Sequence, residues 1–409
     1  MWRGHSCPRS CLLVFPFLIG ITPPVALPSF PRPRGSDMGL SRRSFLQRTA
    51  AGAGAAAILR FPLELLASPE PQRAQSPGGA IKINSNENAY GPLPAGLKAM
   101  QDSVTASNRY PDFGYRALAS QIASWNRIKD EQVLLGVGSS EIIRICALAF
   151  ATPGKNVVTA SPTFEFLGQF AKAMGAEVRE VPLTSSYAHD LDGMLQRTDA
   201  NTSVIYICNC NNPTASVTPD GDITTFLNKV PASALVVIDE AYHHFSMGMP
   251  GYATFMEAAG DRVIVLRTFS KIYGMAGMRL GYGVTSPAMV KKLRSYAVPI
   301  NINVAANAGG IASLQADDEM KVAAQRNAVD RADFTKQAAS RKATMIPSYA
   351  NFAMIKTGQP AKEVMAGFEK QGVLIGRPFP PMLEWVRVTF GLPDEMKAFW
   401  AAWDELKLS

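Results

Sequence analysis

The sequence has no apolar segment long enough to cross a membrane, and it contains little histidine. The longest apolar candidate, residues 11–27, is interrupted by prolines, whereas a membrane-spanning helix needs about 20 predominantly apolar residues. Only four His occur in 409 residues, and no pair of them has the spacing of a helical zinc site. The sequence therefore gives no support to a membrane channel or to a zinc enzyme.

Cysteine is also scarce, with five residues in the whole chain. Cys7 and Cys11 lie within the first 80 residues, and the other three lie in apolar runs. An odd number of cysteines in such positions does not form a disulfide framework. Cys208 and Cys210 are two residues apart on a predicted strand, so their side chains would face the same way. We expect them, with Cys146, to be buried core thiols; a redox or metal role is the alternative.

The excess of positive charge belongs to one end of the chain. Residues 1–80 hold nine Arg, no Lys and three acidic residues, and so contribute +6 of the formal net charge of +8. The rest of the chain is close to neutral. A basic surface for nucleic acid is therefore not predicted.

The N-terminal segment has the pattern of an export signal. Residues 41–47 read Ser-Arg-Arg-Ser-Phe-Leu-Gln and precede an Ala-rich, modestly apolar run at 50–59. This resembles a twin-arginine signal and predicts a periplasmic protein; a chance Arg pair would leave the protein in the cytoplasm. Residues 68–79 are rich in Pro, Gln and Ser and predict a linker. We expect translation to begin at Met38, shortly before the paired arginines.

From residue 81 onward, short apolar runs alternate with helical stretches. Runs rich in Val and Ile predict strands buried on both faces, and their alternation with helices predicts a mostly parallel sheet. The predicted strands are 132–137, 156–160, 177–181, 203–208, 234–238 and 263–266, with helices at 141–150 and 164–174. A strand at 386–390 and a helix at 394–406 follow near the C-terminus.

The predicted fold class is α/β, with a large domain on a mostly parallel central sheet flanked by helices, and a smaller α+β domain. The chain divides into four parts: a leader at 1–80, an N-terminal arm at 81–111 that joins the small domain, a large domain at 112–300, and a small domain at 301–409.

Polar residues follow three of the predicted strands at the point where each strand ends. They are Asn212 after 203–208, Asp239 and Tyr242 after 234–238, and Lys271 with Arg279 after 263–266. In an open α/β sheet, ligands bind beyond the carboxyl ends of the strands. We therefore expect these side chains to converge at one edge of the sheet.

These residue types suit a ring that has a protonated nitrogen, a phenolic oxygen and a phosphate. Asp239 can keep a ring nitrogen protonated, and Asn212 and Tyr242 can donate to the oxygen. The serines at 139–140 begin a predicted helix after a glycine turn, which is a favourable phosphate site. Lys271, close to cationic groups and away from water, would be an amine nucleophile near neutral pH.

Several motifs, taken in order, carry a family resemblance. They are Asn-Glu-Asn-Ala-Tyr-Gly-Pro at 86–92, Arg-Tyr-Pro-Asp at 109–112, Asn-x-x-Asn-Pro-Thr at 209–214, Asp-Glu-Ala-Tyr at 239–242, Ser-Lys-x7-Arg at 270–279 and Arg-Val-Thr-Phe-Gly at 387–391. From about residue 81 to 405, the chain resembles the fold-type-I, class I/II aminotransferases that depend on pyridoxal 5'-phosphate (PLP). Within that family it is most similar to the histidinol-phosphate aminotransferase-like branch.

The resemblance implies a role in PLP binding for each matching residue. Lys271 would carry PLP as a Schiff base and shuttle the proton, Asp239 would hold the ring nitrogen, and Asn212 and Tyr242 would bind the ring oxygen. The phosphate and the ring face would be bound by Ser139, Ser140, Thr268, Ser270, Arg279 and Phe164.

The resemblance also implies a substrate side and a second subunit. Arg387 would bind the carboxylate or phosphate of the substrate, and Asn88 and Arg377 are further candidates. Tyr110 would reach the phosphate site of the neighbouring subunit, so the active unit would be a homodimer.

The implied reaction is ping-pong transamination between an amino acid, or an amino-acid-like phosphate ester, and a 2-oxo acid. A PLP-dependent decarboxylase or lyase of the same fold is the alternative, because it would use the same Lys, Asp and Arg. Ser140, Cys210 and Ala215 depart from the family pattern, but none of them removes a group that the chemistry needs.

Overall fold

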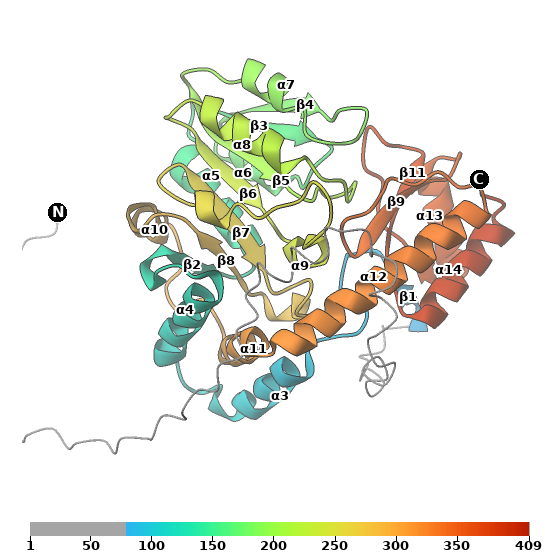
Figure 1. The fold of residues 1–409 in the computed structure, drawn as a ribbon, viewed down its shortest axis with the longest axis horizontal. Helices are drawn as coiled ribbons and strands as arrows, with labels where there is room; N and C mark the ends of the chain where they lie inside the picture. The colour runs from blue at the N-terminus through green and yellow to red at the C-terminus, as the bar shows by residue number, and fades with distance from the viewer. Residues whose placement is uncertain (1–78, 409) are drawn as a thin grey trace, which may run out of the picture. The chain divides into compact units, whose positions relative to one another are not determined.

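The computed structural model describes residues 79–408, which are built around a seven-stranded sheet (Figure 1). The strands lie in the order β2-β8-β7-β6-β5-β3-β4. Neighbouring strands are parallel except that β8 is antiparallel to both β2 and β7. In sheet order the strands are Val133–Gly136, Gly281–Val284, Val263–Thr268, Leu235–Asp239, Thr202–Cys208, Asn156–Ser161 and Glu177–Pro182. The prediction of a mostly parallel sheet is confirmed.

Alternate side chains of these strands enter two hydrophobic cores, one on each face of the sheet. On β6, Val236 and Ile238 belong to one core, whereas Leu235 and Val237 belong to the other. Both β5 and β7 are buried along their whole length. The near-continuous Val and Ile runs in the sequence follow from this burial, because no position on such a strand faces water.

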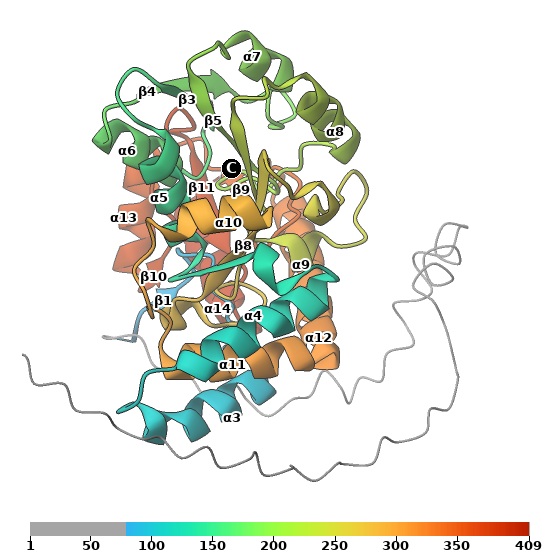
Figure 2. The same cartoon turned by 90° about the vertical axis from the view of Figure 1, so that its left-hand side faces the viewer.

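Helices cover both faces of the sheet, as Figure 1 and Figure 2 show. One face packs against α5 (Ser139–Phe150), α6 (Phe166–Ala173) and α10 (Pro287–Arg294). The other packs against α4 (Asp112–Asn126), α7 (Leu191–Gln196), α8 (Asp220–Lys229) and α11 (Val304–Gln315). Helix α3 (Pro94–Ser103) lies against α11.

The C-terminal part has its own hydrophobic core, which is rich in aromatic side chains. It contains the antiparallel pair β9 (Phe352–Lys356) and β11 (Trp385–Thr389), with α12 (Asp317–Ser340), α13 (Ala361–Lys370) and α14 (Pro393–Glu405). Strand β1 (Ile81–Lys82) pairs in parallel with β10 (Val373–Leu374), so the N-terminal arm is anchored here. We call residues 317–408 together with β1 the C-terminal layer. The domain limits at residues 112 and 301 stay a prediction.

The predicted elements agree with the observed bounds to within two residues. Strand β7 extends beyond its apolar run because Arg267 is buried there and pairs with Glu240. Strand β8 was not predicted, since a four-residue Gly-Tyr-Gly-Val run has no clear periodicity. The remaining short elements are α9 (His243–Ser246) and the 3-10 turns Val104–Ala106, Asp130–Gln132, Met256–Ala258 and Ala276–Met278.

The cysteine predictions have a mixed outcome. Cys146, Cys208 and Cys210 are free and buried, as predicted. The placement of Cys208 and Cys210 on one strand is wrong, because β5 ends at Cys208 and Cys210 lies in the turn beyond it. The reason is that the turn after β5 is itself buried, so its apolar residue looked like a continuation of the strand.

The expected twin-arginine signal and the expected start at Met38 lie in residues 1–78, outside the described part of the chain. Between residues 79 and 408, no helix combines the length and the apolar character that a membrane span requires.

Candidate active site

A cavity of about 560 Å³ lies beyond the carboxyl ends of β5, β6 and β7. Its wall combines residues that follow these strands with residues of the N-terminal arm and of the C-terminal layer. The predicted site residues that line it are Ser139, Ser140, Phe164, Asn212, Asp239, Tyr242, Thr268, Ser270, Lys271, Arg279, Arg377 and Arg387. The structure therefore brings most of the predicted set together, and leaves Asn88 and Tyr110 outside this lining.

Lys271 lies in the loop after β7, and its side chain lines the cavity. Its Nζ donates a 3.0 Å hydrogen bond to the backbone carbonyl of Asn86 and lies 5.6 Å from the ring centroid of Tyr242. Burial lowers the pKa of Lys271 to about 8, and the positive charges of Arg387 and Arg279 contribute to the lowering. An amine with this pKa is partly unprotonated near neutral pH, so it can act as a nucleophile or as a base.

Asp239 is the last residue of β6 and is 2% exposed. The Tyr206 hydroxyl donates to its Oδ2 at 2.8 Å, and the Ala241 backbone nitrogen donates to its Oδ1 at 3.0 Å. Burial raises the pKa of Asp239 to about 6, and the two hydrogen bonds oppose that rise. The carboxylate is ionised at neutral pH and can hold a protonated ring nitrogen.

Asn86, in the N-terminal arm, connects three parts of the site. Its Nδ2 donates to the Tyr242 hydroxyl at 3.0 Å, its carbonyl accepts from Lys271, and its backbone nitrogen donates to Thr389 Oγ1 at 2.9 Å. It is 1% exposed and has a φ of 55°, in the left-handed region. Asparagine tolerates that region better than most residues do. Asn86 therefore holds the lysine amine and the tyrosine hydroxyl in place.

Two residues of this arrangement, Asn86 and Tyr206, are not among the site residues predicted from the sequence. From the Asn-Glu-Asn run at 86–88, Asn88 is the predicted site residue, whereas Asn86 lines the cavity. Tyr206 was not predicted either, although its hydroxyl is the one polar group among the aliphatic side chains at 204–207 of β5. That hydroxyl was the available signal, because a buried Tyr usually finds a hydrogen-bond partner.

Asn88 makes its two hydrogen bonds outside the cavity lining, and its predicted substrate contact stays a prediction. Its Nδ2 donates to the carbonyl of Ile272 at 3.0 Å, and its Oδ1 accepts from the backbone nitrogen of Tyr90 at 3.1 Å. The amide nitrogen thus ties the N-terminal arm to the loop after Lys271, and the amide oxygen binds within the arm. This geometry does not support a role for Asn88 in substrate binding.

Hydroxyl groups and one guanidinium gather at the start of α5. Ser139 is the first residue of α5, Thr268 Oγ1 donates to Ser270 Oγ at 2.9 Å, and Arg279 Nη1 donates to the same Oγ at 3.4 Å. A Cβ added to Gly281 would collide with the backbone nitrogen of Ser139, so glycine is needed for this close approach. A helix N-terminus with hydroxyls and a guanidinium is suited to bind a phosphate.

Two arginines of the C-terminal layer face the cavity, in different environments. Arg387, on β11, is 9% exposed and donates at 2.7 Å both to Asn212 Oδ1 and to the carbonyl of Asn84. Burial lowers the pKa of Arg387 to about 10, so it stays charged at neutral pH. Arg377 is exposed and donates to Glu165 Oε2 at 2.6 Å.

Two of the predicted aromatic residues, Phe164 and Tyr110, differ in position. Phe164 is half-buried and lines the cavity, with its ring centroid 4.5 Å from that of Phe166. Tyr110 is 80% exposed and precedes α4. Phe164 can therefore contact a ligand of its own chain, whereas Tyr110 is free to contact another molecule.

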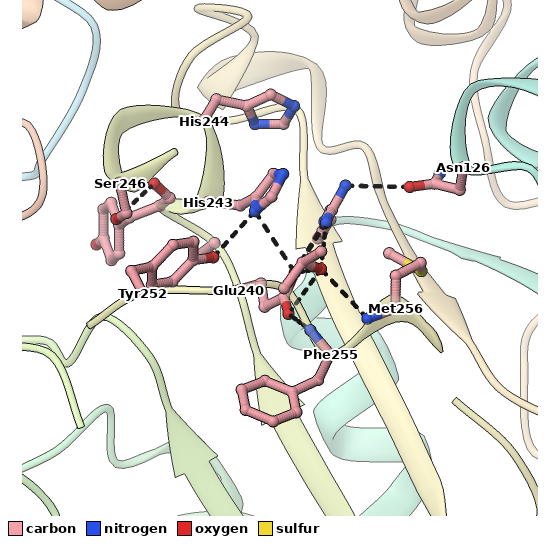
Figure 3. A network of polar contacts seen from close by, with 12 residues as sticks. Asn126, Glu240, His243, His244, Ser246, Tyr252, Phe255 and Met256 are labelled. Carbon is pink, nitrogen blue, oxygen red and sulfur yellow. Dashed lines mark hydrogen bonds and ion pairs between the residues drawn. The ribbon is translucent and has the colours of Figure 1, made fainter. Parts of the chain in front are cut away.

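Behind the cavity, Glu240 is the centre of a buried polar network (Figure 3). Arg267 donates to its Oε2 through Nε at 3.1 Å and through Nη2 at 2.9 Å, and the Phe255 backbone nitrogen donates to its Oε1 at 2.6 Å. Arg267 also donates to Asn126 Oδ1 at 3.0 Å. Burial lowers the pKa of His243 well below its usual value, so this neighbour is uncharged. The network ties the loop after β6 to β7 and to α4.

Comparisons with known proteins give the family. The family model for aminotransferases of class I and II matches residues 79–400. The chain belongs to this family. The aminotransferase is 34% identical over 324 residues to the histidinol-phosphate aminotransferase of Akkermansia muciniphila, covering 78% of this chain and 88% of that protein.

A further relative supports the assignment, and a solved structure shares the fold. The aromatic amino acid aminotransferase of Rhodococcus jostii is 36% identical over 324 residues, covering 79% of this chain and 89% of that protein. A crystal structure of histidinol-phosphate aminotransferase from Sinorhizobium meliloti in complex with PLP has a TM-score of 0.75 and 24% identity, covering 85% of this chain and 97% of that one. The predictions of a PLP-dependent transaminase and of PLP as its cofactor are confirmed.

The cavity residues fit PLP. The cavity supplies a buried carboxylate at Asp239, an amine at Lys271 and a group of hydroxyls at the start of α5, which match the ring nitrogen, the aldehyde and the phosphate. When bound, PLP supplies a protonated ring that withdraws electrons from the α-carbon of the substrate.

Proposed function

We propose that Lys271 is the residue to which PLP attaches and the base that moves the α-proton of the amino donor. The observation that carries this proposal is the position of its amine. The amine lines the cavity with a pKa lowered to about 8, in the same cavity as the buried Asp239 carboxylate. Such an amine can be unprotonated when it attacks, and protonated after it has taken the α-proton.

The other predicted roles follow from the same arrangement. Asp239 holds the ring nitrogen in its protonated form, and Tyr242 donates to the ring oxygen. Arg387 occupies Oδ1 of Asn212, so the amide nitrogen of Asn212 is the group left to donate to that oxygen. The phosphate is bound by Ser139, Ser140, Thr268, Ser270 and Arg279, and Phe164 lies against the ring. Arg387 binds the carboxylate or phosphate of the donor, and the acceptor is a 2-oxo acid.

The test is a donor half-reaction with the purified holoenzyme. Amino acids and amino-acid-like phosphate esters are offered singly, while the absorbance of the cofactor and the release of product are followed. We expect conversion to the amine form of the cofactor, with release of one 2-oxo product per active site. Release of carbon dioxide without that conversion would contradict the proposal.

The variant Lys271→Ala tests the central residue. It should lose covalent attachment of PLP, and its turnover should fall by at least about 10²–10⁴-fold, the usual contribution of a positioned acid or base. The matched control is Lys98→Ala, at an exposed surface lysine, which should behave like the unmodified enzyme. An unchanged cofactor spectrum in Lys271→Ala would refute the assignment.

We also propose that the active unit is a homodimer in which Tyr110 of each subunit reaches the phosphate site of the other. This is supported by the 80% exposure of Tyr110, by its position outside the cavity lining of its own chain, and by the exposed Val104 nearby in the sequence. A mixture of Tyr110→Ala and Lys271→Ala subunits tests it, because a mixed dimer would hold one site with both residues intact. Recovery of activity on mixing is expected. The absence of recovery in a proven mixed dimer would contradict the proposal that Tyr110 reaches the phosphate site of the other subunit.

Finally, we propose that the twin arginines at 42–43 direct export to the periplasm. The support is the sequence pattern of the leader alone. Fractionation of cells that express the full chain and its Arg42→Lys, Arg43→Lys variant tests this. Retention of only the variant in the cytoplasm is expected, and equal distributions would refute it.

A further inference from the structure

An ion pair joins the two sides of the cavity at the end that is lined by Arg377, Arg387 and Phe379, which we call the substrate end. Glu165 immediately precedes α6, which packs on the central sheet, and Arg377 follows β10 in the C-terminal layer. Both residues line the cavity. Arg377 Nη2 lies within hydrogen-bond distance of both carboxylate oxygens of Glu165, at 2.6 Å from Oε2. We call these two residues the mouth pair.

Aromatic rings surround the mouth pair. The Arg377 guanidinium carbon lies 4.3 Å from the ring centroid of Phe379, and that of Arg387 lies 4.8 Å from the same centroid. Phe164 and Phe166 line the cavity on the other side, next to Glu165 in the chain. A donor side chain that enters this end of the cavity therefore meets aromatic faces and one arginine whose charge is already balanced.

The partners of the two arginines differ in charge. Arg387 donates only to neutral oxygens, those of Asn212 and Asn84, and its Nε is buried without a partner among the described residues. Arg377 donates to a carboxylate. A substrate anion can therefore bind Arg387 without displacing an acid, whereas it must displace Glu165 to bind Arg377.

We propose that Glu165 determines donor specificity: by occupying Arg377, it makes the cavity favour donors with an uncharged side chain over donors whose side chain ends in a carboxylate or phosphate. A donor with an uncharged side chain needs only Arg387 for its α-carboxylate and leaves the mouth pair intact. A second anion has to separate the pair and also lies close to the freed Glu165 carboxylate, which repels it. This inference rests on the proposed function, because it assumes that donors react at Lys271.

The experiment compares donor half-reactions of the holoenzyme and its Glu165→Gln variant. L-Phenylalanine is the uncharged donor, L-glutamate carries a second carboxylate, and L-2-amino-4-phosphonobutanoate carries a phosphonate that resembles a phosphate. Glutamine keeps the size and the hydrogen-bonding ability of Glu165 but removes its charge. We expect the ratio of kcat/KM for either anionic donor to kcat/KM for L-phenylalanine to rise about threefold to tenfold, since an exposed pair of this kind is weak. Most of the rise should come from a lower KM.

Two further variants make the result specific. In the double variant Glu165→Gln, Arg377→Met, the gain for anionic donors should disappear, because the freed guanidinium is its source. The matched control is Glu180→Gln, which removes the acid from another exposed ion pair, the one between Glu180 and Lys172. Neither of these residues lines the cavity. That control should leave the donor ratios unchanged.

The outcomes separate this inference from the proposed function. If no donor converts the cofactor in the unmodified enzyme, the proposed function fails. If donors react but Glu165→Gln changes kcat/KM for all three equally, or lowers it for the anionic donors, the role of Glu165 is overturned. A gain for the carboxylate but not for the phosphonate, or the reverse, assigns the discrimination to that one anion.

Discussion

The two ends of the cavity are built in different ways. The proposed ring and phosphate end is made mostly of side chains at the ends of the central strands and at the start of α5, and the N-terminal arm adds Asn86. The substrate end is made of long charged side chains that come from the C-terminal layer and from the segment before α6. We infer that the reacting groups are held by rigid strands and helices, whereas substrate choice depends on contacts between separate parts of the chain.

The charges at the two ends also differ in exposure. Asp239 is buried, and its pKa is raised to about 6 by that burial. In the mouth pair, the side chains of Arg377 and Glu165 are 51% and 40% exposed. Because water screens exposed pairs strongly, substitutions at the ring end should have large effects and those at the mouth pair small ones.

Asp239→Asn should produce the largest effect among the variants that retain Lys271. It leaves a protonated ring nitrogen buried without its carboxylate, and breaking a buried charge pair costs about 3–5 kcal/mol. We expect kcat/KM to fall by about 10²–10⁴-fold for every donor, as measured in half-reactions. Tyr206→Phe keeps the carboxylate and removes one hydrogen bond to it, so it should cost about tenfold. Equal losses in the two variants would mean that the carboxylate charge is not what matters.

Arg387→Gln and Arg377→Gln compare the two arginines directly. Arg387 is buried and free of an acidic partner, so its loss should reduce kcat/KM for L-phenylalanine by about 10²-fold, mainly through KM. Arg377→Gln should change the same value by less than about threefold. If Arg377→Gln lowers kcat/KM more than Arg387→Gln does, the α-carboxylate binds at the mouth pair and not at Arg387.

The pH dependence of PLP attachment gives a smaller effect that links the two ends. The pKa of Lys271 is lowered to about 8 chiefly by burial and also by the charge of Arg387. Attachment to the cofactor-free protein should therefore be slow below about pH 8, where the amine is protonated, and should reach a plateau above it. Arg387→Gln should shift this midpoint to higher pH, as followed by rapid-mixing absorbance.

A distant arginine provides the control for that shift. Arg341 pairs with Asp404 in the C-terminal layer, away from the cavity lining, so Arg341→Gln should leave the midpoint in place. A midpoint that moves to lower pH in Arg387→Gln would contradict the proposed electrostatic coupling.

The smallest effect on activity is expected at Asn88. Asn86→Ala removes a hydrogen bond to Tyr242 at the site, and should lower kcat/KM by about tenfold. Asn88→Ala removes contacts that lie outside the cavity, so it should lower stability by about 1 kcal/mol and change kcat/KM by less than about threefold. Thermal unfolding and donor kinetics, measured on both variants, separate the two roles. A substrate-binding role for Asn88 would appear as a raised KM.

The inner strands of the central sheet were predictable because they are buried along their whole length. A run such as Val236–Val237–Ile238 faces a core on both sides, so every position has to be apolar. The short strand β8 escaped prediction because its two glycines leave few side chains to show a period. The buried turn at Cys210 was misjudged for the opposite reason, since it is apolar without being a strand.

The ring and phosphate end of the site was predictable for a similar reason. Asp239 ends β6, Lys271 lies in the loop after β7, and the parallel order of β6 and β7 brings their carboxyl ends together. Asn86 was not predictable in this way, because it reaches the site from an arm that pairs with β10, far along the chain.

The sequence by itself determined the family and the cofactor through its ordered motifs. It also indicated the residues that line the cavity at the strand ends, because local patterns position those residues there. Only the tertiary structure decided that Asn86 holds Lys271 and Tyr242, that Asn88 does not line the cavity, and that Arg377 is paired with Glu165. The physical reason is distance along the chain. Glu165 and Arg377 are 212 residues apart, and no periodicity or motif records that two such side chains meet. That meeting depends on how the C-terminal layer packs against the central sheet.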